Sequence, residues 1–162
     1  MVAPSAGILL VREVDGVPEF LLVHPGGPFW AKKDEGAWSL PKGEYAPDED
    51  PLAAARREFA EELGCECPDE DLIDLGEVEQ PGGKRVRAWC GIGSIDTGSI
   101  VSNTFEMVWP PRSGNLQRFP EVDRAGWFTL DIAGAKILVG QRLLIDSAVR
   151  ALRQTGRLSA TS

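Results

Sequence analysis

The sequence lacks the features that are typical of secreted and membrane proteins. Its three cysteines, Cys65, Cys67 and Cys90, are an odd and sparse set without the paired spacing of a zinc site. No apolar run is long enough to cross a membrane, and residues 8–11 are too short for the core of a signal peptide. We therefore expect free thiols in a reducing compartment and a soluble, cytoplasmic protein with no membrane partner.

Positive charge is also scarce. The chain carries 17 Lys and Arg residues against 25 Asp and Glu residues, which gives a net charge of −8. Such a chain repels the phosphate backbone of a nucleic acid, so we expect no nucleic-acid duplex as a partner. Local clusters of basic residues can still bind a small anion. The sequence leaves open whether the protein is a monomer or a homodimer.

Length and composition predict one domain. The chain has 162 residues, 43% of them hydrophobic, and contains no internal repeat or low-complexity run. That is enough apolar surface for one buried core and too short for a second full domain. We expect a single domain over residues 1–155, followed by a small, polar and frayed tail over residues 156–162.

Short apolar segments between glycine and proline residues predict a series of strands. These segments are residues 5–12, 19–24, 72–79, 84–91 and 105–109, of which the first four form two expected hairpins. A further strand contains Trp127 and Phe128, whereas the polar residues 112–120 are expected to form a loop. Residues 140–154 have the spacing of an amphipathic helix, with Leu143 in the apolar stripe that covers one face of the sheet.

One segment carries the strongest helix signals in the chain. Asp50 is a suitable N-cap, and Pro51 suits the first helical position, where its missing N–H has no consequence. Gly64 can adopt the left-handed conformation that ends a helix. We therefore expect a helix between Asp50 and Gly64.

Three glutamates lie on one side of this helix. At about 100° per residue, Glu58, Glu61 and Glu62 fall on an arc beside the apolar stripe that contains Phe59 and Leu63. Acids this close repel one another unless a cation lies among them. Hard divalent cations that prefer oxygen ligands, Mg²⁺ or Mn²⁺, are the candidates. For three glutamates alone, a solvated acidic helix face is the simpler interpretation.

The complete spacing favours the metal site. The pattern is Gly43, five residues, Glu49, seven residues, Arg57-Glu58-Phe59, one residue, Glu61-Glu62, one residue and Gly64-Cys65. It resembles the signature of the Nudix hydrolases, with Cys65 in a position that is usually aliphatic. The resemblance implies an α/β fold, the Nudix α/β/α sandwich with a mixed β-sheet. It also implies an enzyme that acts on acid anhydrides, a Mg²⁺-dependent Nudix pyrophosphohydrolase.

The resemblance further implies roles for single residues. Glu58 and Glu62 would be the principal metal ligands, with Glu61 a further ligand, and the Gly43 carbonyl would join them. Arg57 would orient a carboxylate. Its partner would be Glu61, one helical turn away, or Glu49 at the helix entrance.

A later acid completes the implied catalytic set of Arg57, Glu58, Glu61, Glu62 and Glu121. In the resembling family, a loop glutamate shortly before a strand tryptophan often contacts the metal and serves as general base. Glu121 is the best positional match, and Asp123 is the second. An exposed loop acid without a catalytic role is an equal alternative.

Lys42 lies in a Pro-Lys-Gly sequence just before the helix segment. The resemblance is to the branch of the family that cleaves diadenosine tetraphosphate and related polyphosphates, and a lysine beside a polyphosphate has an electrostatic rationale. The expected substrate is therefore a small-molecule nucleotide, first a dinucleoside polyphosphate and second an ordinary or oxidised nucleoside triphosphate. A catalytically silent, nucleotide-sensing Nudix module is the alternative of another class.

Further substrate contacts are expected outside the signature. The Gly- and Pro-rich loop at residues 25–36 contains Trp30, Lys32 and Lys33, which either stack on a base and meet phosphate or pack on the core and face water. Arg87 shares a strand face with Trp89 and either helps to hold phosphate or lies at a solvated edge.

The lone histidine, His24, ends an expected strand just before that loop. We expect a structural histidine whose ring nitrogens are both paired. A contact with substrate stays open.

Overall fold

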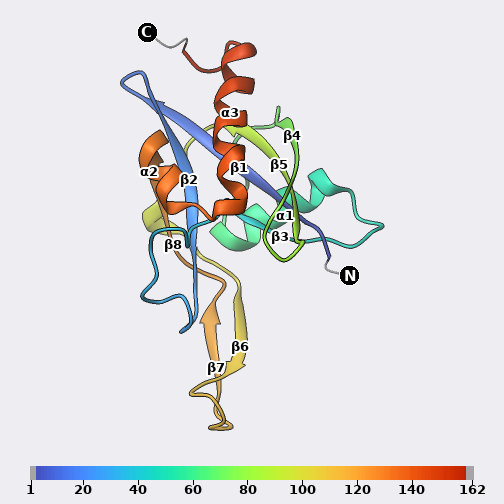
Figure 1. Cartoon of the computed structure of the whole chain (residues 1–162), viewed down its shortest axis with the longest axis vertical. Coiled ribbons are helices and arrows are strands. Elements are labelled where there is room, and N and C mark those ends of the chain that lie inside the picture. The colour runs from blue at the N-terminus through green and yellow to red at the C-terminus, as the bar shows by residue number, and fades with distance from the viewer. Residues whose placement is uncertain (1–2, 160–162) are drawn as a thin grey trace.

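The computed structural model describes residues 3–159, and its central element is a mixed sheet with helices on both sides (Figure 1). The strands of this sheet are β1 Ser5–Val14, β2 Val17–Pro25, β3 Lys42–Glu44, β4 Ile73–Glu79, β5 Arg85–Ile92 and β8 Val122–Thr129. Their order is β4-β5-β1-β2-β8, and β3 pairs with β1 beside this path. β1 and β5 are parallel and the other pairs are antiparallel, so the predicted mixed sheet is confirmed.

Both faces of β1 are buried, which explains its continuous apolar sequence. Ile8 and Leu10 belong to the core under α1 Pro51–Leu63, whereas Leu9 and Val11 belong to the core on the opposite face. That second core is covered by α2 Leu130–Lys136 and α3 Arg142–Gln154, and α3 crosses in front of β1 in Figure 1. The three layers are the predicted α/β/α sandwich.

The first predicted hairpin is present, with strands longer than expected. β1 and β2 continue to the pair Val14 and Val17, and the turn between them has only two residues, Asp15 and Gly16. Both have positive φ, 50° and 80°, which is typical of the tight turns that match the twist of a hairpin.

The predicted limits of α1 are confirmed by its caps. The Asp50 carboxylate accepts a hydrogen bond from the Ala53 amide at 3.0 Å, and Pro51 is the first helical residue. Gly64 has φ 78° and ends the helix, and its amide donates to the Ala60 carbonyl. A side chain at Gly64 would also meet the Val101 carbonyl oxygen at 2.7 Å, so this position requires glycine for two reasons.

Residues 112–120 were expected to form a loop, and this prediction is wrong for residues 116–120, which form a strand. β6 Thr104–Val108 and β7 Leu116–Pro120 form a two-stranded sheet that projects from the body of the molecule (Figure 1). Both faces of β7 are largely exposed, so its sequence lacks the alternation of a half-buried strand. Its one partly buried aromatic residue is Phe119, whose ring lies 5.9 Å from that of Phe105.

Two expectations about the C-terminal part also need correction. The tail is not frayed over residues 156–159, because Leu158 is buried in the core and the Arg157 guanidinium donates to the Asp71 carbonyl oxygen at 2.7 Å. Residues 160–162 lie outside the described part. In α3, Leu143 is 71% exposed, and the buried stripe is Leu144, Ile145, Ala148, Val149 and Leu152.

The cysteines are free thiols, as expected. Cys67 and Cys90 are buried and Cys65 is exposed. Burial raises the pKa of Cys90 to about 12, which leaves this thiol unreactive at neutral pH. Within residues 3–159, no helix is long and apolar enough to span a membrane.

Candidate active site

The acidic side of α1 is organised by one guanidinium group. Arg57 donates to both carboxylate oxygens of Glu49, at 2.9 and 3.1 Å, and to Glu58 at 2.8 Å. It also donates to Glu61 at 3.3 Å. The predicted partners Glu61 and Glu49 are therefore both engaged, and Glu58 is a third. These ion pairs raise the pKa of Arg57, Glu49 contributing most, so the cation is permanent at any physiological pH.

Gly43 and α1 approach each other closely. A Cβ atom at Gly43 would lie 2.1 Å from the Glu58 carboxyl carbon, so only glycine lets this carboxylate reach the backbone of β3. One residue earlier, the Lys42 amide donates to Glu62 at 3.2 Å. β3 therefore lies against two of the predicted ligands, Glu58 beside Gly43 and Glu62 at the Lys42 amide.

The electrostatics of this cluster favour a cation. Burial raises the pKa of Glu62 to about 8, and the charges of Glu58 and Glu121 add to the effect while Lys42 opposes it. Burial also raises the pKa of Glu58, against the stabilising contact with Arg57. Carboxylates whose ionised forms are disfavoured bind a divalent cation in place of a proton.

Glu121 is brought to this cluster from far along the chain. It is the single residue between β7 and β8, and its amide donates to the Asn103 carbonyl at 2.8 Å. The Asn103 amide donates in turn to the Glu61 carbonyl, and the Gly26 amide donates to the Glu121 carbonyl. The alternative acid, Asp123, is instead paired with a histidine outside the cluster.

Glu121 and the α1 glutamates line one acidic cavity of about 370 Å³. Its lining consists of Lys42, Gly43, Glu44, Glu58, Glu61, Glu62, Asn103, Thr104 and Glu121. Five carboxylates of the described residues share this cavity with a glycine backbone, and they form an oxygen-rich donor set of the kind that suits Mg²⁺. Within residues 3–159, no group of three or more His, Cys, Asp or Glu side chains is close enough to hold a metal ion in this arrangement. Arg57 pairs with Glu58 and Glu61, and the Lys42 amide donates to Glu62.

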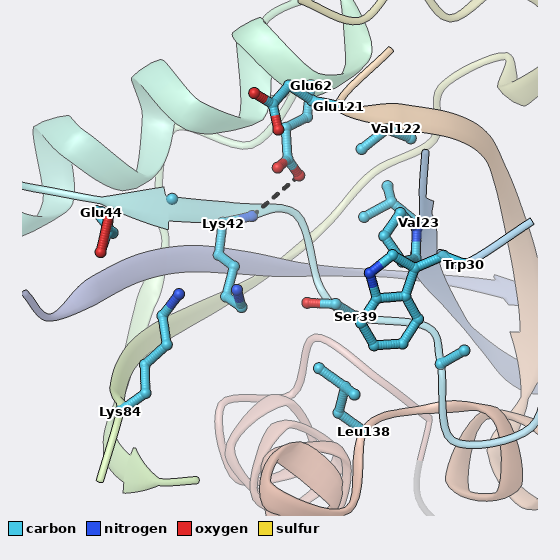
Figure 2. Close-up of a pocket in the computed structure, with 13 residues that line it drawn as sticks. Val23, Trp30, Ser39, Lys42, Glu44, Glu62, Lys84, Glu121, Val122 and Leu138 are labelled. Atoms are coloured by element: carbon cyan, nitrogen blue, oxygen red, sulfur yellow. Dashed lines mark hydrogen bonds between the residues drawn. The ribbon is translucent and has the colours of Figure 1, made fainter. Parts of the chain in front are cut away.

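A second cavity, of about 360 Å³, continues from the acidic one. Both are lined by Lys42, Gly43 and Glu62, and the second is also lined by Lys84 and Trp30. Figure 2 shows the amino groups of Lys42 and Lys84 turned toward each other, with the Trp30 indole on the opposite side. Burial lowers the pKa of Lys42, and the charge of Lys84 adds to this effect while nearby glutamates oppose it.

Lys84 lines this cavity, although the sequence did not predict it as a site residue. Its carbonyl accepts from the Gln80 amide at 2.7 Å, which closes the turn between β4 and β5. The Gln80 side chain accepts from the buried Gln141 at 2.9 Å, so the start of α3 holds this turn in place. No local sequence pattern indicates that Lys84 belongs to the site, because its position beside Lys42 depends on the parallel pairing of β5 with β1.

Three predicted substrate contacts lie elsewhere. Lys32 is exposed, and the Lys33 ammonium lies 5.0 Å from the centre of the Trp30 ring. The Arg87 guanidinium donates to Asp74 at 2.8 Å on the neighbouring strand. None of the three lines either cavity.

His24 is fully buried and both of its ring nitrogens are paired. Nδ1 lies 2.8 Å from the Asp123 carboxylate, and Nε2 lies 2.6 Å from the Lys33 carbonyl oxygen. The structural prediction for this residue is confirmed. His24 connects the loop that contains Trp30 with the start of β8.

Comparison with known proteins gives a family and a fold. A model of the NUDIX domain matches residues 1–143. The structure is similar to a Caenorhabditis elegans Ap4A hydrolase in a binary complex, at 24% identity and a TM-score of 0.62, covering 93% of this chain and 98% of that one. It is also similar to the NUDIX domain of Shewanella oneidensis NrtR complexed with ADP ribose, at 20% identity and a TM-score of 0.62, covering 94% and 89%. No curated protein matches.

A further structural neighbour is Shewanella oneidensis NrtR complexed with a 27mer DNA, at 19% identity and a TM-score of 0.58, covering 96% of this chain and 68% of that one. Because one neighbour binds DNA, the expected absence of a nucleic-acid partner stays a prediction. Identities this low establish the fold, whereas the activity rests on the family and on the site. The family match and the hydrolase neighbour support the predicted pyrophosphohydrolase. With the NUDIX domain matched over residues 1–143, the chain belongs to the Nudix family.

Proposed function

We propose that this protein is a Mg²⁺-dependent pyrophosphohydrolase that acts on dinucleoside polyphosphates. The observation that carries the proposal is the continuity of the acidic cavity with the cavity that contains Lys42 and Lys84. A phosphate chain that lies across both would have its scissile linkage beside the carboxylates and its next phosphates beside the lysines.

The acidic cavity would hold the metal. Glu58, Glu61, Glu62 and the Gly43 carbonyl would be its ligands, and bound Mg²⁺ would neutralise phosphate oxygens and lower the pKa of a water molecule. Arg57 holds Glu58 and Glu61 in position and limits their repulsion. Glu121, which faces the same cavity, would accept the proton of the attacking water.

The second cavity would hold the rest of the substrate. Lys42 and Lys84 would meet phosphates as point charges, and the pKa of Lys42 would return toward its ordinary value once a phosphate lies between the two amines. Trp30 would stack on a base. The similarity to a protein named Ap4A hydrolase supports this substrate class.

Two other functions fit parts of the site. An oxidised or ordinary nucleoside triphosphate would use the same carboxylates and lysines. A nucleotide-sensing module without turnover is favoured by the similarity to NrtR, whose NUDIX domain was found complexed with ADP ribose. A sensing module does not require the complete set of Glu58, Glu61 and Glu62, which favours the enzyme.

A substrate panel separates these functions. The protein is incubated with Mg²⁺ and diadenosine polyphosphates, ordinary and oxidised nucleoside triphosphates, ADP-ribose and a nucleotide sugar, and the products are identified by chromatography. We expect the highest kcat/KM for a diadenosine polyphosphate. Preference for ADP-ribose or a triphosphate would overturn the proposed substrate class but not the proposed reaction class. Tight binding of ADP-ribose without any turnover would favour the sensing module.

A further inference from the structure

Gln141, the residue just before α3, has a fully buried polar side chain. Its amide makes three hydrogen bonds to other segments of the chain. Oε1 accepts from the Leu40 amide at 3.1 Å, and Nε2 donates to the Ser39 hydroxyl at 3.0 Å and to Gln80 Oε1 at 2.9 Å. Because a buried polar group that loses a partner pays its desolvation free energy in full, these contacts hold the segments at fixed positions.

The orientation of this amide is determined by its partners. The Leu40 backbone N–H can only donate, so it must face the amide oxygen, and both hydrogens of the amide nitrogen are left for Ser39 and Gln80. The Ser39 hydroxyl hydrogen is used elsewhere, since it donates to the Leu40 carbonyl oxygen at 2.6 Å. Every donor of the Gln141 side chain therefore has an acceptor. Methionine, which is similar in size, would make none of these bonds.

The hydrogen bonds of Gln141 connect two segments that each carry a lysine of the proposed phosphate-binding cavity. Leu40 lies two residues before Lys42, and Gln80 begins the turn that ends at Lys84. Both lysines line that cavity, and Figure 2 shows their amino groups turned toward each other. Gln141 therefore links the backbones that carry the two cations.

The turn that ends at Lys84 has little rigidity of its own. It contains Gly82 and Gly83, which are exposed and have φ of 90° and 86°. Its hydrogen bonds meet at Gln80, whose amide donates to the Lys84 carbonyl at 2.7 Å and whose carbonyl accepts from the Gly83 amide at 3.0 Å. A Cβ atom at Gly140 would lie 2.9 Å from Gln80 Cα, so the backbone before α3 packs directly on this residue. The position of the turn is therefore set at Gln80.

We propose that Gln141 is a positioning residue that holds Lys84 beside Lys42, so that both lysines contact the phosphates of one substrate. This role rests on the proposed function, because it concerns the phosphate contacts of that site. Two ammonium groups repel each other, so a lysine on a glycine-rich turn would move away from the other cation if nothing held the turn. The buried amide opposes this movement before substrate binds, which lowers the entropic cost of ordering the turn on binding.

Gln141 itself lines neither the acidic nor the lysine cavity. A substitution at this position therefore reaches the phosphates only through the segments that carry the lysines. We expect the contribution of Lys84 to binding to be lost, with KM raised and kcat little changed, because the carboxylates keep their own contacts with Arg57.

A double-mutant cycle measures this dependence as binding, without metal or turnover. Tripolyphosphate is titrated by calorimetry in EDTA into the wild-type protein, Lys84→Gln, Gln141→Met and the double variant. In the wild-type background we expect Lys84→Gln to weaken binding about tenfold, as for the loss of one charged contact. In the Gln141→Met background the same substitution should weaken binding less than about twofold, because the effects of residues that act through one another do not add.

Gln80→Met tests the same connection from the side of the turn. It leaves Gln141 bonded to Leu40 and Ser39, so it decides the question if Gln141→Met does not fold. It should also reduce the effect of Lys84→Gln to less than about twofold. Gln154→Met is the matched control, because Gln154 is exposed at the other end of α3 and lines neither cavity, and in this background the effect of Lys84→Gln should stay about tenfold.

A tenfold effect of Lys84→Gln in the folded Gln141→Met or Gln80→Met protein would overturn the positioning role, even if the enzyme hydrolyses diadenosine polyphosphates. Conversely, the expected cycle in a protein that hydrolyses none of these compounds would disprove the proposed substrate and keep the positioning role. If Lys84→Gln had no effect in the wild-type background, both the role of Gln141 and the lysine cavity as the phosphate site would be wrong, because Lys84 would make no phosphate contact.

Discussion

The two ends of the site are built in different ways. The carboxylate end comes mainly from α1, where Glu58, Glu61 and Glu62 lie within five residues and Arg57 pairs with the first two. The other end is assembled from segments far apart in the chain, with Lys84 at the turn between β4 and β5 and Trp30 in the loop after β2. The proposed metal ligands therefore come mainly from one local helix, whereas the proposed substrate contacts depend on tertiary structure.

The largest expected effect is at the carboxylate end. Glu62→Gln keeps the shape and the hydrogen bond from the Lys42 amide but removes a charge that a divalent cation needs. We expect kcat to fall about 10²- to 10³-fold, as for the loss of other groups that stabilise transition-state charge. Steady-state kinetics on a diadenosine polyphosphate measures this change.

Glu66→Gln is the control for this variant, because Glu66 is an exposed acid just beyond α1 and lines neither the acidic nor the lysine cavity. It should keep the wild-type kcat. Turnover by Glu62→Gln at the wild-type rate, with both proteins folded by circular dichroism, would falsify the metal-binding role of Glu62.

The difference between the two ends also explains what could be predicted from the sequence. The α1 caps and the arc of glutamates follow from spacing over a few residues, and both were predicted correctly. The three layers were implied by the resemblance of the signature to the Nudix family. Lys84 and β7 could not be predicted in this way, because the place of Lys84 depends on sheet register and the exposed β7 has no periodic pattern.

The positions of some residues in correctly predicted elements do not follow from the local pattern. Leu143 fits the helical period of α3, yet the buried stripe includes Ile145 and Val149 and leaves Leu143 outside. Lys32 and Lys33 are in the predicted loop, but their positions depend on how His24 and Trp30 anchor that loop. Periodicity defines an element, and contacts with distant residues then decide which of its side chains reach the site.

The pH dependence of metal binding is the next largest effect. The pKa of Glu62 is raised from 4.5 to about 8, so between these values the folded protein binds a proton that the unfolded chain has released. The stability of the metal-free protein therefore falls as pH rises through this window, while Mg²⁺, which requires the ionised form, binds more tightly. We expect the apparent Mg²⁺ affinity to fall about tenfold for each pH unit below 8.

Thermal unfolding in MgCl₂ and in EDTA, between pH 6 and 8.5, measures this effect. The increase in Tm that Mg²⁺ produces should grow with pH in the wild type. We expect about 2–4 °C for each 1 kcal/mol by which Mg²⁺ binding increases the free energy of unfolding. Glu62→Gln should show a smaller increase that depends less on pH, because the pKa of Glu58 is also raised. A pH-independent increase in the wild type would show that Glu62 does not control metal binding.

At the other end of the site, Lys84→Gln should raise KM about tenfold with little change in kcat, the loss expected for one charged contact to phosphate. Arg85→Gln removes the same charge from the adjacent residue, whose side chain is 64% exposed and lines neither cavity, and should leave KM unchanged. If the two variants had equal effects, the contribution of Lys84 would be that of overall charge, and the lysine cavity would not be the phosphate site.

The smallest effect is expected for Arg87, which sequence reasoning placed among the substrate contacts. Its guanidinium is paired with Asp74 and lies 5.2 Å from the Trp89 ring, and it lines neither cavity. Arg87→Gln should therefore change KM by less than about twofold and Tm by no more than ~1–2 °C, as for other surface substitutions. The same kinetic assay compares it with Lys84→Gln, three residues earlier. A rise in KM as large as that for Lys84 would mean that substrate reaches across the sheet edge to Asp74, and that the binding region extends beyond the cavities described for residues 3–159.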